Sequence, residues 1–309
     1  MILTITLSPT FDLTYSITSV TSHEVNRAGK KEFEPSGKGI NVSVNLAEEK
    51  FETIAVAPVP TNGLGQLWIN LANEKIIIRT SKSSHDLRIN TSIVDTKGVT
   101  KINEEFEKLD LSELQDLITT VEKEVNSHKP SWIALCGSVH PDNAVFLGEN
   151  LRRICDQANI KLAIDTSGKS AKVLFDYSPD FVKPNRDELA EWFPESKDSI
   201  EAYLTCIQNL AKKIDGTVLC TDGGKTAYAT NNENLLEIVP PTIAGVNSVG
   251  AGDASLAGYL AAESSGSDFV TAIKMAMTWA IASCQNSKTA GLNLKAANGA
   301  IATIKELAR

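Results

Sequence analysis

The sequence predicts an α/β protein with a mostly parallel central sheet, helices on both faces and a small antiparallel β lid. In the second half of the chain, short apolar segments such as Trp132–Cys136 and Leu162–Asp165 alternate with helical patterns. Strands that are apolar throughout are typical of parallel sheets covered on both faces. Two segments, at about 12–34 and 88–104, are more polar and do not fit this alternation. The second reads as a hairpin whose strands flank the turn Asp95–Gly98. We expect the 309 residues to form one domain, to which these segments contribute lid strands.

Composition narrows the class of protein. A hydrophobic content of 42% is enough for a large core. The net charge of -8 disfavours nucleic acid and acidic membranes as partners, but it allows an anionic substrate. The 5 cysteines are scattered and form no C-x-x-C pair, which indicates reduced thiols in the cytoplasm. The segment Met1–Leu7 lacks a basic leader and reads as a first strand, and no apolar run reaches the roughly 20 residues of a membrane span.

Further elements continue the alternation along the chain. The predicted elements are a helix around Ala144–Asn159, a strand at Asp180–Lys183 with a helix from near Arg186, a strand at Thr217–Cys220 and a buried helix near Ser267–Gln285. Parallel sheets of this kind bind ligands at the carboxyl ends of their strands. The loops at those ends are polar and rich in glycine, so we expect the functional site there.

The segment Val246–Ser255 carries the most informative motif. Gly250-Ala251-Gly252 places Asp253 in the first turn of a predicted helix. Backbone N–H groups at a helix start can hold a developing phosphate charge, and a carboxylate beside them can take a proton from an attacking hydroxyl. The alternative is an ordinary loop in which Asp253 caps the helix.

A second glycine run lies near the N-terminus. In Gly37-Lys38-Gly39, two glycines flank a lysine, and Asn41 follows at the start of a helical pattern. The backbone and Asn41 can bind sugar hydroxyls at close approach, and Lys38 can bind a phosphate. The alternative is a tight turn with a solvated lysine.

A third motif, Lys183–Glu188, closes a predicted strand. Asn185 and Glu188 are three residues apart, so one helical turn places them on the same face. Oxygen ligands of this kind suit Mg²⁺ beside nucleotide phosphates. The alternative is a capping arrangement at a helix start.

Two common nucleotide-binding motifs are excluded. The stretch Gly223–Thr226 lacks the first glycine of a P-loop, because that position is Leu219. Gly250–Gly252 does not continue as a dinucleotide fingerprint, because Ser255 takes the place of the third glycine. Thr221 and Gly223 can still bind phosphate through a hydroxyl and a backbone N–H.

Taken in order, these blocks resemble the ribokinase-like (PfkB-type) carbohydrate kinases over essentially the whole chain. The Gly-Lys-Gly and Gly-Ala-Gly-Asp blocks look like the two signatures of that family, and Lys183–Glu188 resembles its metal and nucleotide-phosphate motif. The opening Thr6–Asp12, with Leu135–Ser138 and Ile164–Gly168, is similar to the 1-phosphofructokinase and tagatose-6-phosphate kinase branch. In that branch the acceptor already carries a phosphate.

The resemblance implies in-line transfer from ATP with Mg²⁺, with Asp253 as the base and the amides of Gly250, Ala251 and Gly252 stabilising the transferred group. It implies that Lys38 and Arg88 clamp the phosphate of the acceptor. The implied acceptor-binding residues are Asp12, Gly37, Lys38, Gly39, Asn41, Arg88, Asn90 and Ser138. The implied nucleotide-binding residues are Lys183, Asn185, Thr221, Gly223, Asn247 and Asn286, and the implied metal-binding residues are Asn185 and Glu188.

The acceptor implied first is fructose 1-phosphate, which would become fructose 1,6-bisphosphate, and tagatose 6-phosphate comes next. A kinase of an unphosphorylated sugar or nucleoside and a non-catalytic sugar-phosphate or nucleotide sensor remain as alternatives. The chain departs from the family pattern at Ser36, at Asn62, in Glu104–Phe106 and in His140–Asp142. Several of these positions are expected near the sugar. A homodimer through the lid and a cytoplasmic location are also expected.

Overall fold

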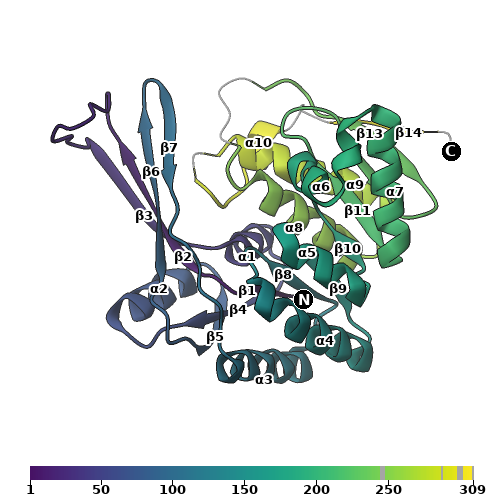
Figure 1. Cartoon of the computed structure of the whole chain (residues 1–309), viewed down its shortest axis with the longest axis horizontal. Helices are drawn as coiled ribbons and strands as arrows, with labels where there is room; N and C mark the ends of the chain where they lie inside the picture. Colours follow the sequence, from purple (N-terminus) through teal and green to yellow (C-terminus); the bar gives the residue numbers. More distant parts are fainter. Residues whose placement is uncertain (244–247, 287, 298–301, 308–309) are drawn as a thin grey trace.

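The computed structural model describes residues 1–243, 248–286, 288–297 and 302–307. A large sheet forms the centre of the molecule, helices cover both of its faces, and a smaller sheet projects away from it (Figure 1). This arrangement confirms the predicted fold class, including the lid.

The large sheet has ten strands among the described residues. Seven neighbouring strands, from β11 to β5, pair in parallel, and β12, β13 and β14 extend the sheet with antiparallel pairing. In spatial order the strands are β14 (Thr303–Glu306), β13 (Leu235–Val239), β12 (Ala227–Thr230), β11 (Thr217–Cys220), β10 (Phe181–Val182), β9 (Lys161–Asp165), β8 (Trp132–Cys136), β1 (Ile2–Thr6), β4 (Thr53–Val59) and β5 (Ile77–Lys82). The sequence did not predict the antiparallel extension.

Two layers of helices cover the sheet, because successive side chains of a strand point to opposite faces. On one face lie α3 (Leu111–His128), α4 (Pro141–Ala158), α5 (Gly168–Leu174), α6 (Arg186–Trp192) and α7 (Ile200–Ile214). On the other face lie α1 (Lys38–Glu48), α2 (Gly63–Asn73), α8 (Ala251–Ser264), α9 (Phe269–Cys284) and α10 (Leu294–Ala297). Two short 3₁₀ segments, η1 (Phe175–Tyr177) and η2 (Pro194–Lys197), complete the described helices.

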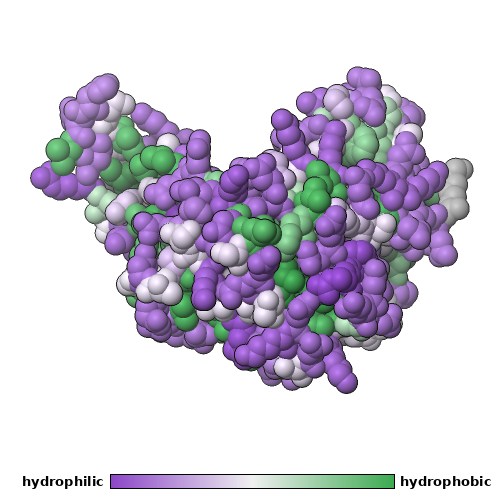
Figure 2. Space-filling view, turned by 60° about the horizontal axis from the view of Figure 1, so that its bottom comes forward, coloured by the Kyte–Doolittle hydropathy of each residue, from purple (hydrophilic) through white to green (hydrophobic). Residues whose placement is uncertain are grey.

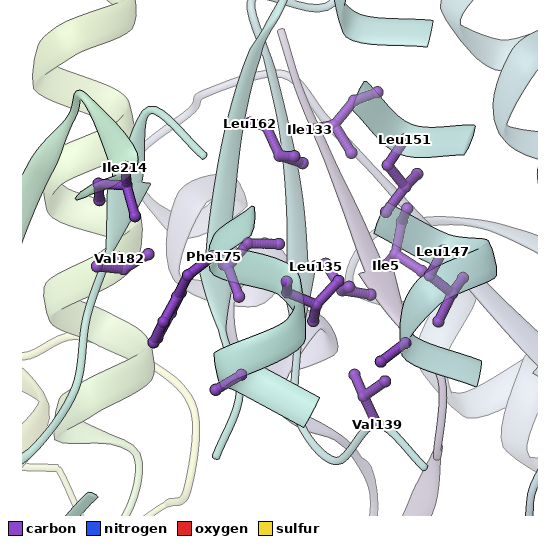
Figure 3. Close-up of a cluster of buried hydrophobic side chains, with 14 of the residues drawn as sticks. Ile5, Ile133, Leu135, Val139, Leu147, Leu151, Leu162, Phe175, Val182 and Ile214 are labelled. Atoms are coloured by element: carbon purple, nitrogen blue, oxygen red, sulfur yellow. The ribbon is translucent and has the colours of Figure 1, made fainter. Parts of the chain in front are cut away.

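The largest apolar cluster lies under the first of these layers. Figure 3 shows side chains of β1, β8 and β9, including Ile5, Leu135 and Leu162, packed against Leu147 and Leu151 of α4. These side chains are almost fully buried, so the strands are held rigidly and their carboxyl ends are fixed in space. The part of the chain described here holds no helix long and apolar enough to cross a membrane.

Local sequence signals set several helix starts. Asp110 and Glu113 form a reciprocal capping box at α3. His140 caps α4 and Pro141 occupies its first turn, so this helix begins three residues before the predicted start at Ala144.

The lid has four strands in the order β3 (Lys30–Ser36), β2 (Thr10–Ser16), β6 (Arg88–Asp95) and β7 (Gly98–Ile102). The pairs β2–β3 and β6–β7 are antiparallel, as the sequence predicts, whereas the two hairpins join through parallel pairing of β2 with β6. This pairing places Asp12 opposite Asn90. In the space-filling view the lid rises on one side of a notch in the surface (Figure 2).

Candidate active site

Asp253 lies in the first turn of α8, on the face of the sheet that α1 also covers. The helix begins at Ala251, and Gly250 at its N-cap has φ of +83°. A Cβ at residue 250 would collide with the carbonyl oxygen of Thr289, so both conformation and space require glycine there. The N-cap position belongs to Gly250 and not to Asp253, and among the described residues no side chain caps this helix start.

The carboxylate of Asp253 is buried and is held by α1. Asn41 Nδ2 donates a hydrogen bond to Asp253 Oδ2 over 2.8 Å. The Asp253 residue is only 6% exposed. Burial raises the pKa of Asp253 to about 6 and outweighs the opposing effect of the Lys38 ammonium. A carboxylate with this pKa is ionised at neutral pH and is a better proton acceptor than an ordinary aspartate.

The helix that carries Asn41 packs unusually close to β1. A Cβ at residue 39 would collide with Thr6 Oγ1, so Gly39 allows α1 to lie directly against the strand end. Lys38, the first residue of α1, extends toward the end of β9.

Asp165 ends β9 and pairs with two lysines through one oxygen. Lys38 Nζ lies 3.4 Å from Asp165 Oδ1, and Lys183 Nζ lies 3.6 Å from the same atom. Burial opposes ionisation of Asp165, but the ammonium groups of Lys183 and Lys38 hold its pKa below the ordinary value. The pair with Asp165 raises the pKa of Lys38. Asp165 Oδ2 is buried and has no partner among the described residues.

The Lys183 ammonium also reaches the start of α8. A Cβ at residue 252 would lie 3.2 Å from Lys183 Nζ. The first N–H groups of a helix have no partner within that helix, and the adjacent cation adds positive charge. The amide of Ala251 makes only a long contact of 3.4 Å with the carbonyl oxygen of Ser248. The start of α8 is therefore suited to bind a phosphoryl group beside Asp253.

Asn185 and Glu188 form a capping box at α6. Asn185 Oδ1 accepts a hydrogen bond from the Glu188 amide, and Glu188 Oε2 accepts one from the Asn185 amide, each over 2.9 Å. One oxygen of Glu188 therefore remains for a ligand. The described residues hold no cluster of three or more His, Cys, Asp or Glu that could bind a metal by itself. This donor set fits Mg²⁺ held by one carboxylate, water and nucleotide phosphates.

Thr221 follows β11 and pairs with Asn185 through an isolated parallel bridge. Gly223 is exposed and has φ of +55°. The two positions lie at the same sheet edge as Asp165 and Lys183. Ser138 is half-buried in the loop after β8. Asn286 follows α9, and its Oδ1 accepts a hydrogen bond from the Lys288 amide, whereas Asn247 lies outside the described residues.

The lid supplies a second group of polar side chains. Asn90 Nδ2 lies 3.4 Å from Asp12 Oδ1. Arg88 donates from Nη1 to the carbonyl oxygen of Glu104 over 2.8 Å and from Nη2 to that of Ser8 over 3.4 Å. Within the described residues no carboxylate forms an ion pair with Arg88, and burial lowers the pKa of its guanidinium.

The structure thus gathers the predicted residues into two groups. Asn41, Asp253, Lys38 and Lys183 surround the start of α8, whereas Asp12, Arg88 and Asn90 belong to the lid. A small cavity lined by Asp12, Ser36, Asn41 and Thr289, among others, lies between the two groups. Among the described residues, Lys38 forms an ion pair with Asp165 and interacts electrostatically with Asp253, and it forms no ion pair with a lid residue.

Asp165 is not among the site residues that the sequence predicts, although its carboxylate lies beside Lys38 and Lys183. The available signal was an acidic residue that ends an otherwise apolar strand, at the edge of the sheet where ligands bind.

Comparisons with known proteins agree with the fold. The family model for pfkB family carbohydrate kinases matches residues 6–296. A 1-phosphofructokinase from Rhodobacter capsulatus is 24% identical over 282 residues, which are 91% of this chain and 89% of the relative. A 1-phosphofructokinase from Bacillus subtilis (strain 168) is 28% identical over 270 residues, with 84% and 85% covered. The crystal structure of a possible 1-phosphofructokinase from Thermotoga maritima covers 99% of both chains with a TM-score of 0.87 and 20% identity.

The fold and the charged helix start define an α/β phosphotransferase that acts on an alcohol group. The chain belongs to the PfkB family of carbohydrate kinases.

Proposed function

We propose that this protein transfers the γ-phosphoryl group of ATP to a ketohexose phosphate, with fructose 1-phosphate as the favoured acceptor and tagatose 6-phosphate as the next. The observation that carries the proposal is the buried carboxylate of Asp253, whose pKa is raised to about 6, at the glycine-rich start of α8. Two relatives named 1-phosphofructokinase support this choice of acceptor.

In the proposed mechanism, Asp253 accepts the proton of the acceptor hydroxyl as that oxygen attacks phosphorus. Asn41 orients the carboxylate through the 2.8 Å hydrogen bond. The amides at the start of α8 and the Lys183 ammonium stabilise the charge on the transferred group. Mg²⁺ bound near Glu188 would neutralise charge on the nucleotide phosphates, and Thr221 and Gly223 would bind those phosphates through hydroxyl and N–H groups.

Arg88 supports an acceptor that already carries a phosphate. Among the described residues its guanidinium donates hydrogen bonds to carbonyl oxygens, and its Nε is buried without a hydrogen-bond partner. A partly buried cation without a carboxylate partner is suited to a bound anion. Asn90 lies two residues after Arg88 on β6 and is in register with Asp12 of β2, and both side chains would bind sugar hydroxyls.

The test is a coupled ADP-release assay with ATP and Mg²⁺ across sugar phosphates, free sugars and nucleosides. We expect turnover with fructose 1-phosphate, and we expect Arg88→Ala to raise KM for the phosphorylated acceptor at least tenfold. Arg153→Ala serves as the control, because Arg153 pairs with Glu122 on the helices of the opposite face. Efficient turnover of free sugars with no effect of Arg88→Ala would instead favour a kinase of unphosphorylated acceptors. Ligand binding without turnover would favour a sensor.

We also propose a homodimer through the lid. Successive residues of its strands alternate, so Asp12 and Asn90 share one face while Leu13, Tyr15 and Ile93 share the other. Ile102 of β7 is 57% exposed, and Figure 2 shows apolar side chains gathered on the lid. Light scattering of the wild type and of Ile102→Asp tests this: the wild type should be dimeric and the variant monomeric. A wild-type monomer would overturn the proposal.

A further inference from the structure

The segment Glu104–Leu109 connects the lid strand β7 to α3 and passes beside Arg88. Glu104 holds this strand end in two ways: its carbonyl oxygen accepts from Arg88 Nη1 over 2.8 Å, and its Oε2 accepts from the Ile89 amide over 2.9 Å. The chain departs from the expected Glu-Pro-Gly turn at the next two residues, where it has Glu105 and Phe106.

Phe106 lies between Arg88 and the loop after β8. The Arg88 guanidinium carbon is 5.7 Å from the centre of the Phe106 ring. The ring also meets the His140 ring edge to face, with centroids 6.3 Å apart and an interplanar angle of 76°. Both separations are within the range of cation–π and aromatic contacts. Phe106 therefore joins the lid to the residue that caps α4.

The far end of the segment is firmly anchored. Lys108 Nζ lies 3.1 Å from Asp142 Oδ2, and the carbonyl oxygen of Lys108 lies 3.0 Å from His85 Nε2. Leu109 exchanges two hydrogen bonds with the Asn143 side chain, over 3.1 and 2.9 Å. Because Asp142 and Asn143 belong to the first turn of α4, the segment that carries Phe106 is anchored to α4 as well as to the lid.

These contacts determine where the Arg88 guanidinium lies. The guanidinium contacts two carbonyl oxygens and the Phe106 ring, while Nε has no hydrogen-bond partner among the described residues. We propose that Phe106 is a positioning residue that acts through Arg88 and sets how strongly the enzyme prefers a phosphorylated acceptor over the same sugar without its phosphate. This inference rests on the proposed role of Arg88 as a phosphate clamp.

The test compares Phe106→Leu, which keeps apolar volume but removes the π face, with Phe106→Tyr, which keeps the ring. Phe106→Leu should raise KM for fructose 1-phosphate by about 3- to 30-fold, the range of a partly desolvated cation–π contact. The KM for ATP and the activity with high concentrations of fructose should stay unchanged. Phe106→Tyr should remain within about twofold of the wild type. Phe51→Leu, which removes a half-buried ring packed against Trp279, is the control for general loss of packing.

The Arg88→Ala variant separates this inference from the proposed function. In an Arg88→Ala background, Phe106→Leu should have no further effect on KM for the sugar phosphate. The inference is overturned if Phe106→Leu leaves KM unchanged, or if it raises KM equally with and without Arg88. If Arg88→Ala alone leaves KM unchanged, the phosphate clamp fails, and the role of Phe106 fails with it.

Discussion

Asn41 and Asp253 are separated by 212 positions in the sequence, yet Asn41 Nδ2 donates to Asp253 Oδ2 over 2.8 Å in the interior of the protein. The bond joins the start of α1 to the start of α8, the two helices that carry the glycine runs. It fixes the carboxylate in one orientation beside the amides that would bind the transferred phosphoryl group.

Replacement of the proposed base should abolish catalysis without loss of the fold. We expect Asp253→Asn to reduce kcat by about 10²- to 10⁴-fold, the usual contribution of a general base. ATP binding, measured by calorimetry, should change little, because Lys183, Thr221 and Gly223 are untouched. Turnover close to that of the wild type would exclude Asp253 as the base.

The raised pKa of Asp253 predicts a pH limit on turnover. The base must be ionised, so kcat should fall as the pH drops below about 6. A sugar phosphate also titrates near this pH, so a variant is needed to assign the limit. Asp165 raises the pKa of Asp253, and Asp165→Asn should therefore move the limit to lower pH. A limit that stays in place in kcat profiles at saturating substrate would belong to another group.

The same shift makes a prediction about stability. A carboxyl whose pKa is raised on folding stabilises the folded state fully at a pH below its unfolded pKa. For Asp253 this contribution to stability is lost as the pH rises through about 6. Asp253→Asn removes that loss, so the variant should be more stable than the wild type at pH 8, by at most about 3 kcal/mol. At pH 4 the two should be similar. Urea unfolding at both pH values checks the sign, and a difference that does not depend on pH would contradict it.

Replacing only one partner of the buried ion pair between Asp165 and Lys183 should strongly destabilise the protein. Asp165→Leu leaves the Lys183 ammonium buried without a partner and should destabilise the protein by about 3–5 kcal/mol. Adding Lys183→Met should restore much of the loss, because no buried charge of this pair remains. Glu32→Leu breaks the exposed pair with Lys30 and should change the free energy of unfolding by less than about 1 kcal/mol. Equal losses from the buried and exposed pairs would refute this account.

Gly250 should tolerate no side chain, because a Cβ there would collide with the backbone. Gly266 has a similar φ but no close neighbour, so it serves as the control. Gly250 and Gly266 have φ of +83° and +79°, but only at residue 250 does a Cβ meet the carbonyl oxygen of Thr289. Gly266→Ala should cost about 1 kcal/mol from backbone strain alone. Gly250→Ala should cost more in thermal unfolding and should also lower kcat, because the start of α8 must shift. Similar effects of the two variants on stability and kcat would show that the close approach does not matter.

Much of the architecture could be predicted because strand and helix periodicity reflect burial, which is local information. The apolar segment Trp132–Cys136 is a parallel strand, and Arg88–Glu104 contains the predicted hairpin. The pairing partners could not be predicted in the same way. The parallel contact of β2 with β6 and the antiparallel edge β12–β14 depend on which strands meet after the helices have packed.

The sequence by itself determined which residue types stand at the strand ends: two glycine runs, a carboxylate at residue 253 and a lysine at residue 183. The spacing of the glycines is sufficient to locate these positions, because glycine is needed where the backbone approaches a ligand closely. Only the tertiary structure decided that Lys38 pairs with Asp165 at the centre while Arg88 stays apart on the lid beside Phe106. Electrostatic contacts depend on distances between side chains that are far apart in the chain, and those distances exist only after the sheet and its helices have formed.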